Sequence, residues 1–176
     1  MIRSRTVSLV TVALLIAPPS AFANPLGANV VGGQATVQGQ GSALVTVTQS
    51  SQNAIINWNT FNLAPGDKTQ FNQLNSSSIA LNRVTGGLGP SQIFGAISAN
   101  GRVFLINPYG ILLGAGSQIN TAGFLASTHD IANDDFMAGN YKFNKPGQPN
   151  ASIVNLGNIH ITPSSTGFAA LVAPGV

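Results

Sequence analysis

Residues 93–131 read IFGAISANGRVFLINPYGILLGAGSQINTAGFLASTHDI, in which short apolar runs are interrupted every five to eight residues by Asn, Gly or Pro. Runs this short, bounded by turn formers, are typical of buried strands in a parallel β architecture and are too short for helices. Because the runs follow one another in series, the stretch predicts a coil of stacked β-strands.

The same pattern extends along most of the chain and predicts an all-β protein. Each coil of about 20 residues would bury its apolar face on the neighbouring coils. We expect strands at residues 43–48, 54–58, 69–71, 79–82, 92–94, 102–106, 111–113, 119–120, 124–127, 152–156, 158–161 and 168–172. Residues 26–41 are rich in Gly and Gln and predict an N-terminal cap containing a strand and a hairpin.

One region, residues 130–150, interrupts the pattern with three of the four acidic residues of the chain, two lysines and two prolines. It predicts an excursion outside the β-helix, formed as a hairpin around residues 137–143. From residue 152 the strand pattern resumes and reaches Val176 without a polar capping segment. Because the ends of such coils need caps, we expect further β-helix beyond Val176.

The first residues predict a secretory signal peptide, residues 1–23. Two arginines precede an apolar run over residues 7–17, and the small residues Ala21 and Ala23 place cleavage before Asn24. The run is shorter than the ~20 residues that a membrane-spanning helix needs, so an uncleaved anchor is the weaker interpretation. The working division is therefore a signal peptide followed by one domain.

The composition predicts a surface that is polar but nearly uncharged. Charged residues make up 6% of the chain and apolar residues 44%, which is the reverse of the disordered signature. Without the signal peptide, five basic residues face four acidic ones, a net charge of +1. No basic stripe is present, so we expect no nucleic-acid partner. The absence of Cys suits a chain that crosses an oxidising compartment unfolded, or a β-fold of this size that needs no disulfide.

Several short blocks stand in a distinctive order along the chain. They are residues 56–62 (INWNTFN), 71–73 (FNQ), 80–84 (ALNRV), 92–95 (QIFG), 100–111 (NGRVFLINPYGI) and 123–128 (GFLAST). Their order and spacing resemble the haemagglutination-activity domain of filamentous-haemagglutinin-like exoproteins, the two-partner secretion family. That family usually has Asn where this chain has Tyr109, which puts a side-chain role at this position in doubt.

This resemblance implies a right-handed, single-stranded parallel β-helix over residues 24–176. It also implies the N-terminal secretion module of a large adhesin or haemagglutinin-type protein, with no cofactor. Export by the Sec machinery to the periplasm would be followed by recognition by the POTRA domains of an outer-membrane β-barrel transporter. The domain would then nucleate β-helix folding outside the cell, in a secreted or cell-surface protein.

The segment from Asn107 to Gly110 has the residue order of a type I β-turn, with Asn first, Pro108 fixing φ at the second position and Gly fourth. A structural role alone explains this order. The resemblance implies an alternative, in which Asn107, Pro108, Tyr109, Gly110 and Ile111 form a motif for transporter recognition or folding. The order of residues is compatible with both interpretations.

A second candidate block contains Trp58, Asn59, Phe61 and Asn62. We expect Trp58 and Phe61, together with Phe71, to be core residues, because the large area that aromatic rings bury stabilises the coil they face. The weaker alternative is an exposed aromatic contact with a partner.

The candidates for acid-base or metal chemistry are His129, Asp130, Asp134 and Asp135. Adjacent aspartates point to opposite faces of a strand, so a joint site needs a bend. We expect solvated loop charges rather than calcium binding or catalysis, and an outward-facing His160. No nucleophile elbow, phosphate-binding loop, zinc spacing or dinucleotide fingerprint is present, so the sequence predicts neither an enzyme nor a metal site.

Two other functions remain open alternatives. The domain itself could be an adhesin that binds carbohydrate or a host surface through its amide-rich face, although no cluster of aromatics suited to sugar stacking is apparent. Host glycans would otherwise be contacted only through the full-length protein. A polysaccharide lyase or hydrolase would need several acids on one face, whereas three of the four lie in one predicted loop.

Overall fold

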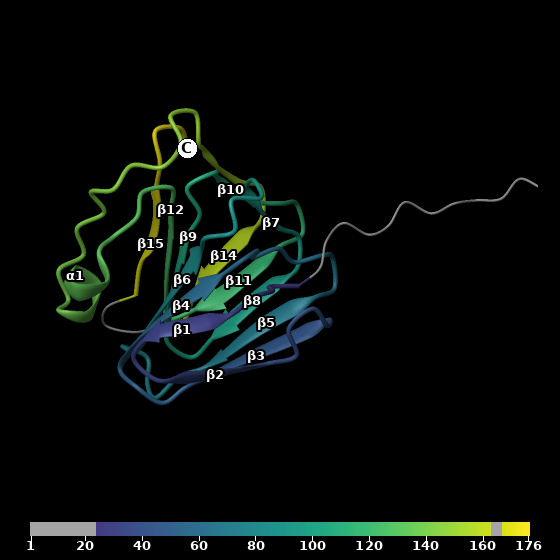
Figure 1. Cartoon of the computed structure of the whole chain (residues 1–176). Helices are drawn as coiled ribbons and strands as arrows, with labels where there is room; N and C mark the ends of the chain where they lie inside the picture. Colours follow the sequence, from purple (N-terminus) through teal and green to yellow (C-terminus); the bar gives the residue numbers. More distant parts are fainter. Residues whose placement is uncertain (1–23, 163–166) are drawn as a thin grey trace, which may run out of the picture.

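The computed structural model describes residues 24–162 and 167–176 as a coil of short strands that forms three sheets (Figure 1). The predicted signal peptide, residues 1–23, lies outside the described residues. A complete turn of the coil, such as the one over residues 91–106, contributes one strand to each sheet, whereas the first turns contribute none to the smallest sheet. Gln118 pairs with Ala96 on the preceding turn, so one coil takes 22 residues (118 minus 96). The fold is the predicted right-handed parallel β-helix.

Two of the three sheets have six strands and the third has three. The long sheet contains, in spatial order, β1 (Asn29–Gly32), β4 (Asn53–Trp58), β6 (Ile79–Val84), β9 (Arg102–Ile106), β12 (Gly123–Ser127) and β15 (Ala169–Val172). The polar sheet contains β14 (Asn158–Ile161), β11 (Gln118–Thr121), β8 (Ala96–Ala99), β5 (Lys68–Asn72), β3 (Leu44–Gln49) and β2 (Ala35–Gln38). The short sheet contains β13 (Ile153–Asn155), β10 (Ile111–Leu113) and β7 (Ser91–Ile93).

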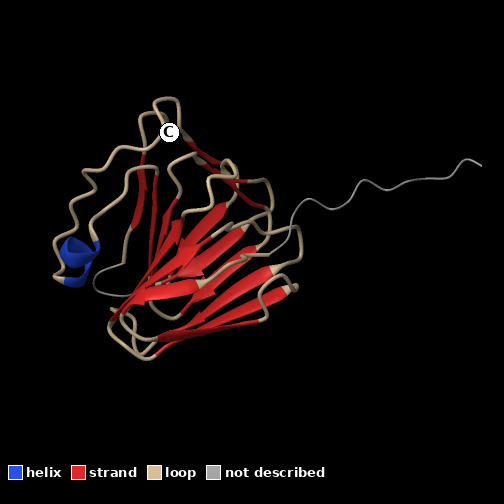
Figure 2. Cartoon of the chain, in the orientation of Figure 1, coloured by secondary structure: helices blue, strands red, loops and turns tan. Residues whose placement is uncertain are grey.

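The predicted N-terminal cap is formed by β1 and β2. Both strands pair antiparallel with their neighbours, β4 and β3, whereas the named strands of the later coils pair in parallel. The β1 pairing shifts register between Val30 and Gly32, and such a bulge makes a sheet edge less able to pair with another chain. Figure 2 shows both strands at one end of the stack.

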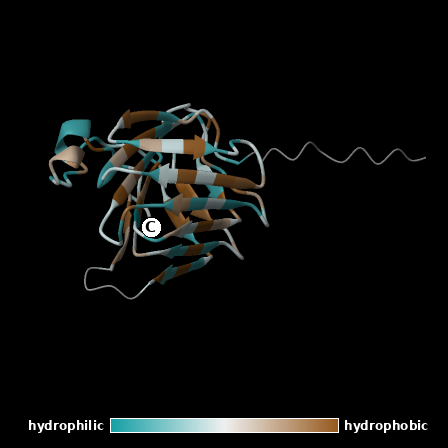
Figure 3. Cartoon of the chain, turned by 90° about the horizontal axis from the view of Figure 1, so that it is seen from below, coloured by the Kyte–Doolittle hydropathy of each residue, from teal (hydrophilic) through white to brown (hydrophobic). Residues whose placement is uncertain are grey.

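The main core fills the interior of the coil. In β3 and β5 buried residues alternate with more exposed ones, because one face of the polar sheet meets solvent. Figure 3 shows strands on which hydrophobic and hydrophilic residues are mixed along the same strand. Trp58, Phe61 and Phe71 are buried, and the first two rings meet edge to face with centroids 5.4 Å apart. Their predicted role as core residues is therefore confirmed.

A second apolar cluster covers the outer face of the long sheet. Strand β6 is buried along its whole length, because residues of the excursion (residues 130–150) pack on the side away from the main core. Phe104 of β9 is surrounded by aromatic rings, among them Phe136 at 6.1 Å and Tyr141 at 5.6 Å between centroids. The excursion therefore buries apolar surface that a bare β-helix would expose.

The chain leaves the coil and returns to it at an antiparallel bridge between Asp130 and Lys145, as expected for a loop outside the coil. Helix α1 (Asn133–Met137) ends where the hairpin expected around residues 137–143 would begin, and residues 138–144 contain no strand, so that hairpin does not form. The acidic residues in the first turn of α1 interact favourably with the helix dipole. Gly139, with φ +77°, follows the C-terminal end of the helix. A left-handed glycine serves a hairpin turn and a helix end equally well, so the sequence did not separate the two.

Two strand predictions also need correction. Strand β8 was missed, because its residues Ala96–Ala99 include only one large apolar side chain. Strand β7 ends at Ile93, one residue earlier than expected. The ring of Phe94 instead lies over Gly114, where a Cβ would stand 2.3 Å from the ring.

Candidate functional site

The segment Asn107–Gly110 forms the predicted turn. The amide of Gly110 donates to the carbonyl of Asn107 at 3.1 Å, the bond that closes a β-turn. The Asn107 side chain accepts from the amide of Tyr109 at 2.9 Å, and Gly110 has φ +116°. The residue types therefore match the backbone that they adopt.

The turn is tied on one side to the loop that precedes β7. Asn107 is buried, and its Nδ2 donates to the carbonyl of Gly89 at 3.1 Å and to Oγ of Ser91 at 3.0 Å. The amide of Ser91 in turn donates to the carbonyl of Gly110 at 3.0 Å. Both the Nδ2 donor and the Oδ1 acceptor of the Asn107 side chain are therefore used in contacts within the protein.

On the other side the turn contacts the returning arm of the excursion. The amide of Gln148 donates to the carbonyl of Pro108 at 2.8 Å, and the amide of Ile111 donates to the carbonyl of Ser152 at 3.0 Å. A Cβ at Gly147 would stand 2.8 Å from the Pro108 oxygen. The turn is therefore packed between successive coils.

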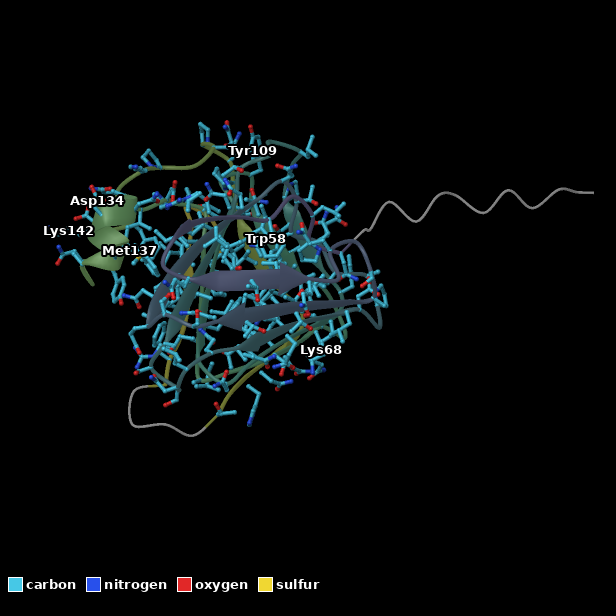
Figure 4. All side chains as sticks on the ribbon, turned by 60° about the horizontal axis from the view of Figure 1, so that its bottom comes forward. Trp58, Lys68, Tyr109, Asp134, Met137 and Lys142 are labelled. Atoms are coloured by element: carbon cyan, nitrogen blue, oxygen red, sulfur yellow. The ribbon has the colours of Figure 1, made fainter. Side chains whose placement is uncertain are left out.

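Of the five motif residues, Tyr109 alone is exposed, with 41% of its surface accessible, and Pro108 is half-buried. Figure 4 shows the Tyr109 side chain among the outer loops, away from the buried Trp58. Its hydroxyl approaches Gly87, where a Cβ would lie 3.5 Å away. A partner of the folded domain can reach the motif mainly through this one side chain.

The second block lies beside the first at the same corner of the coil. Oδ1 of Asn62 accepts from the amide of Gln92 at 2.9 Å, while Asn59 is exposed. A Cβ at Gly86 would stand 2.2 Å from the carbonyl oxygen of Asn59, so only glycine permits this close approach between coils. The loop of residues 85–90, whose role the sequence did not reveal, joins the two blocks.

Together these segments enclose a cleft of about 190 Å³, called here the corner cleft. No charged residue lines it. Its walls include Asn59, Phe61, Asn62, Leu88, Ser91 and Asn107. The structure therefore brings together residues of both sequence-predicted blocks, which are about 45 positions apart in the chain (107 minus 62).

The predicted acidic group does not form a site. Nε of Arg83 contacts Oδ1 of Asp130 at 2.7 Å, so the expectation that Asp130 is a solvated loop charge is wrong. Asp134 lies on the exposed surface of α1 (Figure 4), and His160 faces outward as predicted. Within residues 24–162 and 167–176, no three His, Cys, Asp or Glu side chains are placed to hold a metal ion.

Burial raises the pKa of Tyr141 above its ordinary value of 10.0, and the positive charge of Arg102 opposes part of this rise. The phenol lies among the rings that cover the long sheet. It belongs to the packing of the excursion and not to the corner cleft. No helix in the described part of the chain has the length and apolar character needed to cross a membrane.

The fold and the cleft define a capped β-helical module with an uncharged surface depression. The TPS secretion domain family matches residues 21–176. The chain therefore belongs to the TPS, or two-partner secretion, domain family. That family comprises secretion domains of exported proteins and is not an enzyme family. The chain is therefore part of a secreted or cell-surface protein. Membership of the family also implies a cognate outer-membrane transporter.

Similar proteins come from Haemophilus influenzae. A heme/hemopexin-binding protein of strain Rd is 40% identical over 107 residues, which are 61% of this chain and 12% of the relative. A second heme/hemopexin-binding protein is 36% identical over 113 residues, 64% of this chain and 12% of the relative. The crystal structure of the HMW1 secretion domain matches with a TM-score of 0.77 and 36% identity, and covers 85% of this chain and 45% of that one. The chain thus spans a small part of the curated relatives.

Proposed function

We propose that the chain is the N-terminal secretion module of a large exported adhesin or haemagglutinin-type protein, recognised by the POTRA domains of an outer-membrane β-barrel transporter. The observation that carries this proposal is the family match over residues 21–176. The 36% identity to a solved secretion domain of the same fold supports it.

Recognition would use extended segments of the unfolded chain, which add as strands to the transporter. Main-chain hydrogen bonds supply the affinity in strand addition, and side-chain pockets supply the specificity. The chain suits this mode because its strands are short and contain few charges, with charged residues at only 6% of the sequence.

Export would begin with the Sec machinery and cleavage between Ala23 and Asn24, in the periplasm. Asn24 is the first described residue, is buried, and donates from its side chain to the carbonyl of Ser42. The mature chain would thus begin inside the folded cap.

Outside the cell, the domain would nucleate the folding of downstream coils. The antiparallel strands β1 and β2 close one end of the stack, whereas β13, β14 and β15 lie at the opposite ends of their sheets. An edge of parallel strands offers backbone groups on which another coil can pair. Folding in this direction would also hinder return of the chain through the transporter.

Secretion from a Gram-negative host, with and without the transporter encoded beside the gene, tests this function. We expect the processed chain in the medium only when the transporter is present. Retention in the periplasm in both strains, despite cleavage of the signal peptide, would contradict the proposal.

A second candidate function is adhesion by the domain itself. The outer face of the polar sheet presents an in-register row of polar, hydrogen-bonding side chains, formed by Thr46, Gln70, Ser98, Asn120 and His160. Such a row offers donors and acceptors to the hydroxyls of a neutral glycan. Binding of the purified mature chain to a glycan array tests this candidate, and no binding would leave adhesion to other parts of the protein.

A further inference from the structure

The corner between the short sheet and the polar sheet changes length from one coil to the next. Residues 94–95 alone join β7 to β8, whereas residues 114–117 join β10 to β11 on the following coil. On the preceding coil, residues 64–67 separate Leu63, which pairs with Ile93, from the start of β5. The short corner is therefore recessed between two longer turns, and a cleft of about 280 Å³ lies there.

Glycines allow the coils to approach one another closely at this cleft. A Cβ at Gly95 would stand 2.3 Å from the carbonyl oxygen of Asp67 and 2.6 Å from that of Ala64. A Cβ at Gly114 would stand 2.3 Å from the ring of Phe94, so the ring lies against the backbone of the next coil. Phe94 is half-buried and lines the cleft, which gives the cleft an aromatic floor.

From this cleft a trough continues along the outer face of β8. The outward-facing residues of β8, Ala96 and Ser98, have small side chains. The residues in register with them on β5 and β11 have longer side chains, and they are Lys68, Gln70, Gln118 and Asn120. Figure 4 shows Lys68 away from helix α1, so the excursion does not cover this surface. We call the surface formed by these six residues and Phe94 the β8 trough.

The width of the β8 trough and the pairing of its floor narrow the class of ligand. Strands β5 and β11 flank β8 and are therefore roughly 10 Å apart. This gap admits one extended chain, whereas a helix with its side chains is itself about 10–12 Å wide. The backbone of β8 is paired on both sides, so a peptide cannot bind it by strand addition. The ligand is held by side chains.

The side chains of the trough offer an apolar ring and polar groups without a net charge. The face of the Phe94 ring is negative and attracts weakly positive C–H groups. Asp67 and Lys68 both line the cleft and carry opposite charges. The side-chain amides of Gln118 and Asn120 make no hydrogen bond to another described residue, and each offers donors and an acceptor. A neutral pyranose sugar, with an apolar face and hydroxyl groups at its edge, matches these features.

We propose that the β8 trough binds an extended, neutral, β-linked glycan of the cellulose-like kind. One pyranose ring lies on Phe94 in the cleft, and the following rings lie over Ala96 and Ser98. The trough is straight because it follows one strand, and a glycan of this kind is likewise extended. This proposal rests on the second candidate function, adhesion by the domain itself, and gives that function a site and a ligand class.

Isothermal titration calorimetry of the purified mature chain with cellohexaose tests the site. We expect saturable binding that changes less than about twofold between low and high salt, because the ligand is neutral. Maltohexaose is the matched control ligand, since it contains the same sugar in a curved, α-linked chain. It should bind at least about tenfold more weakly.

Two variants locate the binding on the molecule. Ala96→Gln fills the floor of the β8 trough with an uncharged side chain on the outer face of the sheet, and should weaken cellohexaose binding at least about tenfold. Thr36→Gln makes a similar change at an exposed position of β2, at the far edge of the same sheet, and should bind like the unmodified chain. Circular dichroism and thermal unfolding establish that both variants remain folded.

The possible outcomes separate this site from the function on which it rests. The site is overturned by an absence of cellohexaose binding, by equal binding of maltohexaose, or by unchanged binding of Ala96→Gln. Saturable binding of an uncharged, extended peptide in place of the sugar would also overturn it. If the glycan array still shows binding in these cases, adhesion by the domain stands with a different site. An array without any binding would instead contradict adhesion by the domain itself.

Discussion

Replacing Arg83 with methionine tests how the excursion is held on the long sheet. The guanidinium of Arg83 donates to Oδ1 of Asp130 at 2.7 Å, to the carbonyl of Ile131 at 2.8 Å and to Oδ1 of Asn133 at 2.9 Å. Methionine retains much of the packing of the aliphatic stem. The substitution leaves the Asp130 carboxylate and the Ile131 carbonyl without the guanidinium donor that they share.

The expected loss is about 3 kcal/mol in the free energy of unfolding. Removing one partner of a buried ion pair costs roughly 3–5 kcal/mol, because the other charge stays buried and unpaired. The Arg83 side chain is 10% exposed, but that of Asp130 is 25% exposed, so water compensates part of the loss. The lower end of the range is therefore expected.

Urea denaturation of the mature chain measures this loss, and limited proteolysis within residues 130–150 reports detachment of the excursion. Lys68→Met is the matched control, because Lys68 lies on the polar sheet, away from the excursion. In the Arg83→Met background, Asp130→Asn should restore about 1 kcal/mol by removing the unpaired charge. A loss below about 1 kcal/mol for Arg83→Met, or an equal loss for Lys68→Met, would refute this account of the excursion.

Three further predictions concern the turn and the excursion. Gly110→Ala should lower the free energy of unfolding by about 2 kcal/mol, because the residue has φ +116° and a Cβ would lie 2.9 Å from the Ser152 carbonyl. Thermal denaturation measures this loss, and an unchanged melting temperature would contradict the structural role of the turn. Tyr109→Asn should change stability by less than about 0.5 kcal/mol, because Tyr109 is exposed, and should leave transporter-dependent secretion unchanged, because the two-partner secretion family usually has Asn at this position. A variant that is destabilised would point to a packing role for the ring instead. Burial raises the pKa of Tyr141, so its stabilising contribution is complete below the unfolded tyrosine pKa of about 10 and is lost as pH rises through the folded value. Tyr141→Phe should therefore reduce the difference between the urea midpoints measured at about pH 9 and about pH 11. An unchanged difference would show that other groups cause the loss of stability at high pH.

The local pattern of residues determined the strands and the turn. Runs such as Arg102–Ile106 and Ile111–Leu113 are short, apolar and bounded by turn formers, and both form the predicted strands. The order of residues in Asn107–Gly110 likewise predicted a hydrogen-bonded turn, which the structure contains. These features depend on neighbours in the sequence, because backbone preference and alternation act over a few residues.

The tertiary structure alone decided which distant residues meet. The corner cleft joins residues from three loops because successive coils stack in register, which pairs Leu63 with Ile93 and Ser91 with Ile111. The ion pair between Arg83 and Asp130 spans 47 positions, and helix α1 forms where Phe136 can be buried on the long sheet. No local pattern encodes such contacts, since their free energy arises only when the coils have packed together.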